Sequence, residues 1–145
     1  MSGPADNRSF FYVNGAVPFD ARCYVERPAD RRLQDLILRG ELCFVLTASQ
    51  MGKTSLIFRT QAELRKQNIP NAYLDLHRFG GNADIEPWCR SFLNALSSQL
   101  GLDVSVSAWW MEQSAYTPID RLVRFIREVV CRQIGGTAAI FIDEI

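Results

Sequence analysis

Short apolar runs alternate along this chain with longer segments in which apolar residues recur every three or four positions. Three runs have the length and composition of buried β-strands, namely Leu42–Leu46, Ala72–Leu76 and Ala138–Ile142. Helical periodicity fills the stretches between them. The alternation of strands and helices predicts an α/β fold with a parallel sheet, whose crossovers are expected to be right-handed.

Helices are predicted where this periodicity coincides with residues that start or stop a helix. They cover residues 28–39, residues 53–67, the segment from Pro87 to Leu100, and a segment that opens at Thr117-Pro118 and runs to Val130. Trp109-Trp110 lies in a stretch predicted to be irregular. We expect these two rings to pack in the core; a contact patch for another domain is the alternative.

The turn after the first predicted strand has the residues of a phosphate-binding loop, or P-loop. It reads Thr47-Ala-Ser-Gln-Met-Gly-Lys-Thr54 and departs from the pattern Gly-x-x-x-x-Gly-Lys-Ser/Thr at its first position. In such a turn, backbone N–H groups point into one concavity at a helix N-terminus, where the helix dipole favours an anion. A chance Gly-Lys-Thr in an ordinary strand-turn-helix connection is the alternative.

Each residue at the end of this loop has its own predicted role. The N–H groups of residues 50–53 would hold phosphate, and Gly52 would let the backbone approach it without a Cβ in the way. Lys53 would reach the β and γ phosphates, and the Thr54 hydroxyl would bind Mg²⁺. The loop therefore predicts binding of a nucleoside triphosphate.

A second motif closes the chain, where an apolar run from Ala138 to Ile142 ends in two acids. This is the form of a Walker B strand, which delivers carboxylates to the C-terminal edge of a sheet. Asp143 would hold the Mg²⁺ shell through water, and Glu144 would orient or deprotonate the water that attacks the γ-phosphate. Taken alone, the run could equally be a buried strand with two solvated acids at its end.

The chain resembles the AAA-like domain at the N-terminus of large bacterial signalling proteins, especially those with WD40 repeats, within the STAND class of P-loop ATPases. The stretches that carry the resemblance span nearly the whole chain: Phe11–Gly15, Tyr24–Asp30, Gln50–Leu56 and Ile140–Glu144. The family commonly replaces the first glycine of the P-loop, in agreement with Thr47. It often has arginine where this chain has Ser49, so any phosphate contact from that position is in doubt.

The resemblance implies a three-layer P-loop NTPase fold with a parallel sheet that is incomplete at its C-terminus. Residues 16–145 would form a partial AAA-like domain, preceded by a partly loose segment of residues 1–15. The family continues beyond the position of Ile145 with a strand that senses the γ-phosphate and a helical lid. Since that strand lies between the P-loop strand and the Walker B strand, we expect their edges to be left unpaired, or to collapse onto each other, without it. Poor or absent ATP hydrolysis by this chain alone follows as an expectation.

The resemblance also implies the ligands and the site. ATP, rather than GTP, and Mg²⁺ would be the cofactors, with Lys53 and Glu144 in catalytic roles and Thr54 and Asp143 at the metal. Nucleotide contacts would come from Val25, Gln50, Met51, Gly52, Lys53, Thr54 and Ser55. Val25 would lie against the adenine. Arg27 would pair with an acid or a phosphate, or remain an exposed arginine beside the helix start.

Composition limits the partners and the location. The 145 residues contain 48% hydrophobic residues, enough for a core, and 16 basic residues balance 16 acidic ones. No global field therefore draws the chain to nucleic acid or to anionic membranes. With neither a signal peptide nor an apolar run of membrane-spanning length, a cytoplasmic protein is expected.

No metal site built from cysteine or histidine is predicted. Cys23, Cys43, Cys89 and Cys131 are scattered without a Cys-x-x-Cys pair, so reduced thiols are expected, the last three as small core residues. His77 has no second metal ligand nearby in the sequence, and a structural role is expected for it.

Three classes of function remain open. The first is an ATP-dependent signalling switch that acts on C-terminal effector domains, WD40 or similar, and that could form a nucleotide-dependent oligomer. The second is an ATPase proper. The third is a nucleic-acid-handling ATPase that helps transposition or replication initiation, a class that usually has a basic face.

Overall fold

A computed structural model describes residues 25, 27–46, 51–80 and 84–144 of the chain. The chain divides into two compact units, residues 1–63 and residues 64–145. The predicted loose segment of residues 1–15 lies outside the described residues, as do Gln50 of the P-loop and Cys23.

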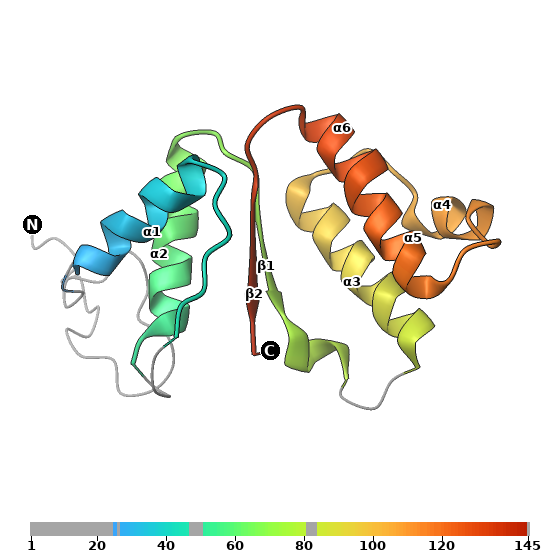
Figure 1. Ribbon diagram of the computed structural model, residues 1–145, viewed down its shortest axis with the longest axis horizontal. Helices are drawn as coiled ribbons and strands as arrows, with labels where there is room; N and C mark the ends of the chain where they lie inside the picture. The colour runs from blue at the N-terminus through green and yellow to red at the C-terminus, as the bar shows by residue number, and fades with distance from the viewer. Residues whose placement is uncertain (1–24, 26, 47–50, 81–83, 145) are drawn as a thin grey trace, which may run out of the picture. The chain divides into compact units, whose positions relative to one another are not determined.

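The first unit contains helix α1 (Pro28–Leu38) and most of helix α2 (Lys53–Lys66), coloured blue to green in Figure 1. Pro28 lies in the first turn of α1, where its missing N–H costs no hydrogen bond, and Gly40 follows the helix with φ +74°. Leu33 is buried on the inner face of α1. The helices predicted over residues 28–39 and 53–67 are thereby confirmed to within one residue.

The strand predicted at Leu42–Leu46 is wrong, because residues 41–46 adopt no regular secondary structure. Leu42, Phe44 and Leu46 are 84%, 74% and 89% exposed. A strand needs a neighbour for its backbone N–H and C=O groups, and an apolar sequence does not replace one. Among the described residues no strand pairs with this segment.

The second unit contains a two-stranded parallel sheet formed by β1 (Asn71–Asp75) and β2 (Ala139–Asp143). Tyr73 lies opposite Phe141 and Asp75 opposite Asp143, so the two strands end level with each other. The outer edge of β1 is capped by the Gln99 side chain, which donates to Tyr73 O and accepts from Tyr73 N, both at 2.8 Å. The amide thus occupies backbone groups that another strand could otherwise pair with.

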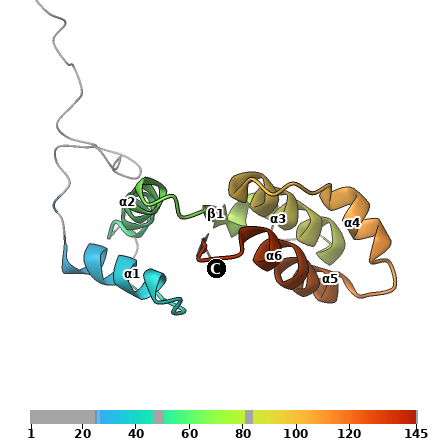
Figure 2. The ribbon, with the colours of Figure 1, turned by 90° about the horizontal axis from the view of Figure 1, so that it is seen from above.

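Helices connect the two strands and supply the core of this unit (Figures 1 and 2). A 3₁₀ turn (η1, Leu76–Phe79) follows β1, and helix α3 (Ile85–Leu100) packs against β1. The next helices are α4 (Val106–Glu112), α5 (Pro118–Phe125), a π-helical turn (η2, Ile126–Val130) and α6 (Cys131–Ile134). Buried side chains from β1 and these helices form one cluster that includes Ala72, Leu74, Cys89, Leu93, Leu96, Trp110 and Phe125.

Helix α4 corrects the prediction of an irregular stretch around Trp109-Trp110. Ser105 caps it by accepting a hydrogen bond from Ala108 N at 3.3 Å. Trp110 is 1% exposed, and the Trp109 ring meets Phe125 edge to face with ring centres 5.0 Å apart. Core packing of the pair is therefore confirmed.

The cysteine predictions are confirmed in part. Cys43, Cys89 and Cys131 are free thiols, and Cys89 is fully buried. Cys131 is exposed and Cys43 is only half-buried in the irregular segment, so neither is a core residue. Burial, followed by the Glu86 charge, raises the pKa of the Cys89 thiol, in accord with an inert structural cysteine.

The α/β class and the parallel pairing are confirmed by this arrangement. The described strands make a small sheet of two, with the predicted strands at residues 72–76 and 138–142 each displaced by one residue.

Candidate functional site

The N-terminus of α2 carries the described part of the predicted P-loop. Gly52 precedes the helix with φ +76°, a conformation that favours glycine, and its carbonyl accepts the N–H of Leu56 at 3.0 Å. Lys53 and Thr54 therefore lie in the first helical turn, where backbone N–H groups have no partner further up the helix. Because α2 is 14 residues long, its dipole adds partial positive charge at this end.

The remaining residues predicted to contact nucleotide differ in accessibility. Met51 is 61% exposed and Val25 is 78% exposed. Ser55 is 5% exposed, within α2. Its hydroxyl is thus a less accessible candidate than that of Thr54, which is half-buried.

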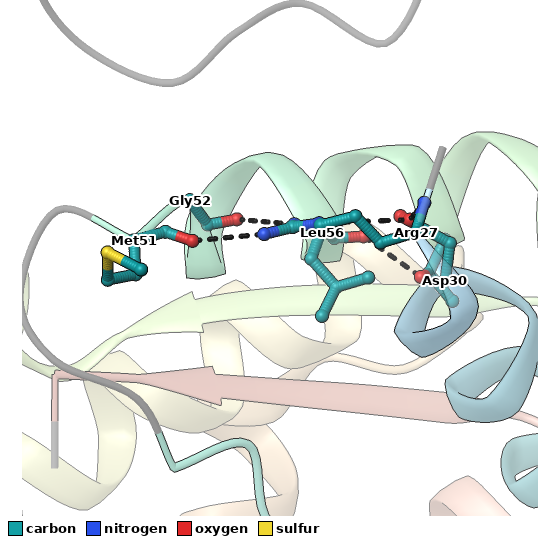
Figure 3. A network of polar contacts seen from close by, with 6 residues as sticks. Arg27, Asp30, Met51, Gly52 and Leu56 are labelled. Atoms are coloured by element: carbon teal, nitrogen blue, oxygen red, sulfur yellow. Dashed lines mark hydrogen bonds and ion pairs between the residues drawn. The ribbon is translucent and has the colours of Figure 1, made fainter. Parts of the chain in front are cut away.

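Arg27 joins α1 to the end of the P-loop within the first unit (Figure 3). Its guanidinium donates from Nη1 to the Met51 carbonyl at 3.1 Å and from Nη2 to the Gly52 carbonyl at 3.5 Å. The Arg27 N–H donates to Asp30 Oδ2 at 2.6 Å, and Arg27 Nε lies 3.9 Å from the same oxygen. The predicted pairing of Arg27 with an acid is confirmed, with Asp30 as the acid.

The acidic residues of the candidate site lie at the C-terminal ends of β1 and β2, in the second unit. Asp143 is 8% exposed, and both of its carboxylate oxygens accept hydrogen bonds. Oδ2 accepts from the Tyr73 hydroxyl at 3.0 Å, and Oδ1 accepts from the Glu144 N–H at 3.1 Å. Burial, followed by the hydrogen bond and the charge of Asp143, raises the pKa of Tyr73 well above its usual value. The phenol therefore stays protonated as a donor to Asp143.

Glu144 follows β2 in a left-handed conformation, with φ +58°. Such a conformation is uncommon for residues other than glycine. It takes the Glu144 side chain out of the pattern in which successive side chains of a strand point to opposite faces. Glu144 is 55% exposed, and its Oε2 lies 3.6 Å from His77 Nδ1. His77 is held in turn by its own N–H, which donates to Asp75 Oδ1 at 3.1 Å. The Glu144 side chain is thus 55% exposed, whereas Asp143 is 8% exposed.

The sequence did not predict the contact of Tyr73 with Asp143 or the contact of His77 with Glu144. His77 was expected to be structural, and Tyr73 was not singled out at all. The sequence pattern could have pointed to Tyr73, because residues 73 and 75 lie on the same face of one strand. If two parallel strands end level with each other, that face lies beside Asp143 on the neighbouring strand. The register that aligns the two ends comes from the structure.

Other features of the described residues bear on ligands. No three His, Cys, Asp or Glu side chains gather there as a ready-made metal cluster. Mg²⁺ bound through one carboxylate and substrate phosphates does not need one. A hollow of about 500 Å³ lies between α1 and α2, but its lining combines acids with arginines and contains none of the predicted nucleotide contacts: Asp30, Arg31, Gln34, Asp35, Arg59, Thr60 and Glu63.

Membrane insertion finds no support in the helices that the structure describes, none of which combines the length and the apolar character needed to span a bilayer.

Comparison with known proteins gives the family. The chain is 30% identical over 138 residues to an uncharacterized WD repeat-containing protein of Synechocystis sp. (strain ATCC 27184 / PCC 6803 / Kazusa). The matched region is 93% of this chain and 12% of that relative, so the chain spans about an eighth of its length. No solved structure matches the chain significantly. A family model described as AAA-like domain matches residues 12–145, and the chain belongs to this family of AAA-like domains.

Proposed function

We propose that this chain is an ATP-binding P-loop domain that works as a nucleotide-dependent switch in a signalling protein. The observation that carries the proposal is the start of α2, where a glycine with positive φ is followed directly by Lys53 and Thr54 in the first helical turn. This arrangement offers backbone N–H groups, a lysine and a hydroxyl to a phosphate chain and its Mg²⁺. Family membership supports the same conclusion.

In this proposal several residues of the loop bind the triphosphate together. Lys53 contacts the β and γ phosphates, and the N–H groups of Gln50, Met51, Gly52 and Lys53 hold phosphate oxygens. Ser55, which follows Thr54 in α2, also contacts the nucleotide in this proposal. Val25, which is 78% exposed, is accessible to an adenine ring.

The acidic strand end would complete the site. Mg²⁺ would bind the Thr54 hydroxyl and the shell of Asp143, whose carboxylate is already oriented by Tyr73. Glu144 would orient the attacking water, because its carboxylate is more than half exposed. We place hydrolysis in the complete protein, within a three-layer P-loop fold.

The partner is inferred from the relative. Its printed name describes a WD repeat-containing protein, and this chain covers 12% of it. We therefore propose that the domain acts in the cytoplasm on a WD-repeat or similar effector region of a longer protein, and that the bound nucleotide changes that contact or an oligomeric state.

Titration calorimetry of the 145-residue chain with Mg²⁺ and ATP, ADP or GTP tests the proposal. ATP and ADP are expected to bind, and GTP is expected to bind more weakly. Absence of heat with every nucleotide, from a chain whose circular dichroism is that of a folded protein, would contradict it.

A further inference from the structure

The Arg27 guanidinium bonds to two consecutive peptide groups at the end of the P-loop. Nη1 donates to the Met51 carbonyl at 3.1 Å and Nη2 to the Gly52 carbonyl at 3.5 Å, so each arm of the fork holds one carbonyl (Figure 3). A Cβ on Gly52 would lie 3.6 Å from both Nη atoms, at ordinary van der Waals distance. The guanidinium thus covers one side of this backbone.

The two bonded carbonyls fix two amide groups as well. A trans peptide unit is planar, and its C=O and N–H point in opposite directions. The Met51 carbonyl belongs to the same plane as the Gly52 N–H, and the Gly52 carbonyl to the same plane as the Lys53 N–H. No cis peptide occurs among the described residues. Holding the Met51 carbonyl toward Arg27 therefore turns the Gly52 N–H to the opposite side. The Gly52 carbonyl also accepts the Leu56 N–H at 3.0 Å, so α2 and Arg27 together orient the Lys53 N–H.

Arg27 is held in place by contacts with the first turn of α1. It is the residue before α1. Its backbone N–H donates to Asp30 Oδ2 at 2.6 Å, and its side-chain Nε lies 3.9 Å from the same carboxylate oxygen. Asp30 is 8% exposed, so the acid that anchors the arginine is fixed within α1. The loop is consequently tied to the start of α1 and not only to its own helix.

We propose that Arg27 is a positioning residue, whose two-armed contact with the Met51 and Gly52 carbonyls aims the Gly52 and Lys53 N–H groups at phosphate. This inference rests on the proposed function, since it names the residue that prepares that site. Arginine is required because its planar fork can hold two acceptors at once, whereas a lysine ammonium acts as a single point charge.

The test compares Arg27→Lys and Arg27→Gln with the matched control Arg32→Gln, which removes an exposed arginine from the same helix. MgATP and inorganic tripolyphosphate are titrated into each protein by calorimetry. The amide ¹H–¹⁵N signals of Gly52 and Lys53 are recorded without nucleotide. The first measurement reports the affinity, and the second reports changes in the environment and hydrogen bonding of the two peptide groups.

Both Arg27 variants are expected to bind MgATP and tripolyphosphate about tenfold more weakly, the change expected when one charge-assisted hydrogen bond is lost. Their Gly52 and Lys53 signals should shift in the nucleotide-free protein. Arg32→Gln should match the wild type in both measurements. If Arg27→Gln fails to fold, Arg27→Lys alone tests whether Arg27 is a positioning residue.

Wild-type affinity in Arg27→Lys would overturn the proposal, because charge alone would then suffice. Weaker binding with unchanged amide signals would also overturn it, since Arg27 would then act on the nucleotide directly. The amide signals separate the two ideas. If the wild type binds no nucleotide, the proposed function fails, whereas unshifted signals in the variants defeat the positioning role alone.

Discussion

Both carboxylate oxygens of Asp143 are occupied by hydrogen bonds, one from the Tyr73 hydroxyl and one from the Glu144 N–H. The Tyr73 bond joins the two strands through their side chains at the end of the sheet, and it places a neutral donor against a buried carboxylate. Removing that donor leaves the Asp143 oxygen without its phenol partner. Asp143 is therefore expected to depend on Tyr73 for its orientation.

Tyr73→Phe is predicted to lower the free energy of unfolding by about 1 kcal/mol near neutral pH, the typical value of one hydrogen bond. The difference from wild type should shrink as the pH rises above 10.0, the ordinary tyrosine pKa. The unfolded wild type releases the phenolic proton in that range while the folded protein retains it, so the wild type alone loses this contribution. Urea unfolding of both proteins across this range measures it. A difference that grows with pH would contradict the assignment.

Glu144→Gln separates binding from hydrolysis. The amide keeps the size of the side chain but cannot accept a proton from water. Nucleotide affinity should therefore remain within about twofold of wild type, while ATP turnover in any longer protein that contains this domain falls at least about a hundredfold. Calorimetry and phosphate release measure the two effects. Asp84→Asn removes an acid at the N-cap of α3 and serves as the control, with turnover expected to be unchanged. Undiminished hydrolysis in Glu144→Gln would assign the water to another residue.

Helix boundaries are the element-scale features that sequence predicts best. Thr117 accepts the Asp120 N–H at 3.3 Å and donates its hydroxyl to Asp120 Oδ2 at 2.6 Å, and Pro118 follows in the first turn. The long helix that runs from α5 through η2 to α6 thus begins where the Thr-Pro pair predicts. The cap is local chemistry, and it needs no knowledge of the rest of the fold.

Thr117→Ala is predicted to destabilise the protein by about 1 kcal/mol, because the first turn of α5 loses its side-chain acceptor. Thr117→Ser, which keeps the hydroxyl, should recover most of this stability. Denaturant unfolding of the three proteins provides the measurement. Equal stability of the alanine and serine variants would show that the cap contributes nothing.

The elements that were mispredicted depend on distant partners. Leu42–Leu46 has the composition of a strand, yet a strand forms only beside another one, and that pairing is not encoded in the segment itself. Helix α4 has seven residues, about two turns, which is too short for apolar periodicity to reveal it. The candidate P-loop and the two acids of the candidate Walker B strand could be identified in the sequence because they are contiguous motifs. The contacts of Arg27 and Tyr73 join residues 24 and 70 positions apart, and they required the fold.

The balanced charge of the whole chain argues against the nucleic-acid-handling class of function. With 16 basic and 16 acidic residues, no excess of cations is available to release counterions from DNA phosphates. We predict no salt-dependent binding of the chain to double-stranded DNA in fluorescence anisotropy, with or without MgATP. A dissociation constant that rises steeply with salt concentration would instead favour the nucleic-acid-handling class.

The central claim is that the P-loop binds MgATP, and the lysines of the chain allow a direct test. Lys53 and Lys66 are its only lysines and lie at opposite ends of α2, so Lys53→Ala and Lys66→Ala make the same change in charge on the same helix. A fluorescent ATP analogue with Mg²⁺ is titrated against wild type and both variants. The account predicts that wild type and Lys66→Ala bind alike and that Lys53→Ala binds at least about tenfold more weakly. Equal binding by Lys53→Ala, or no binding by the wild type, would contradict it.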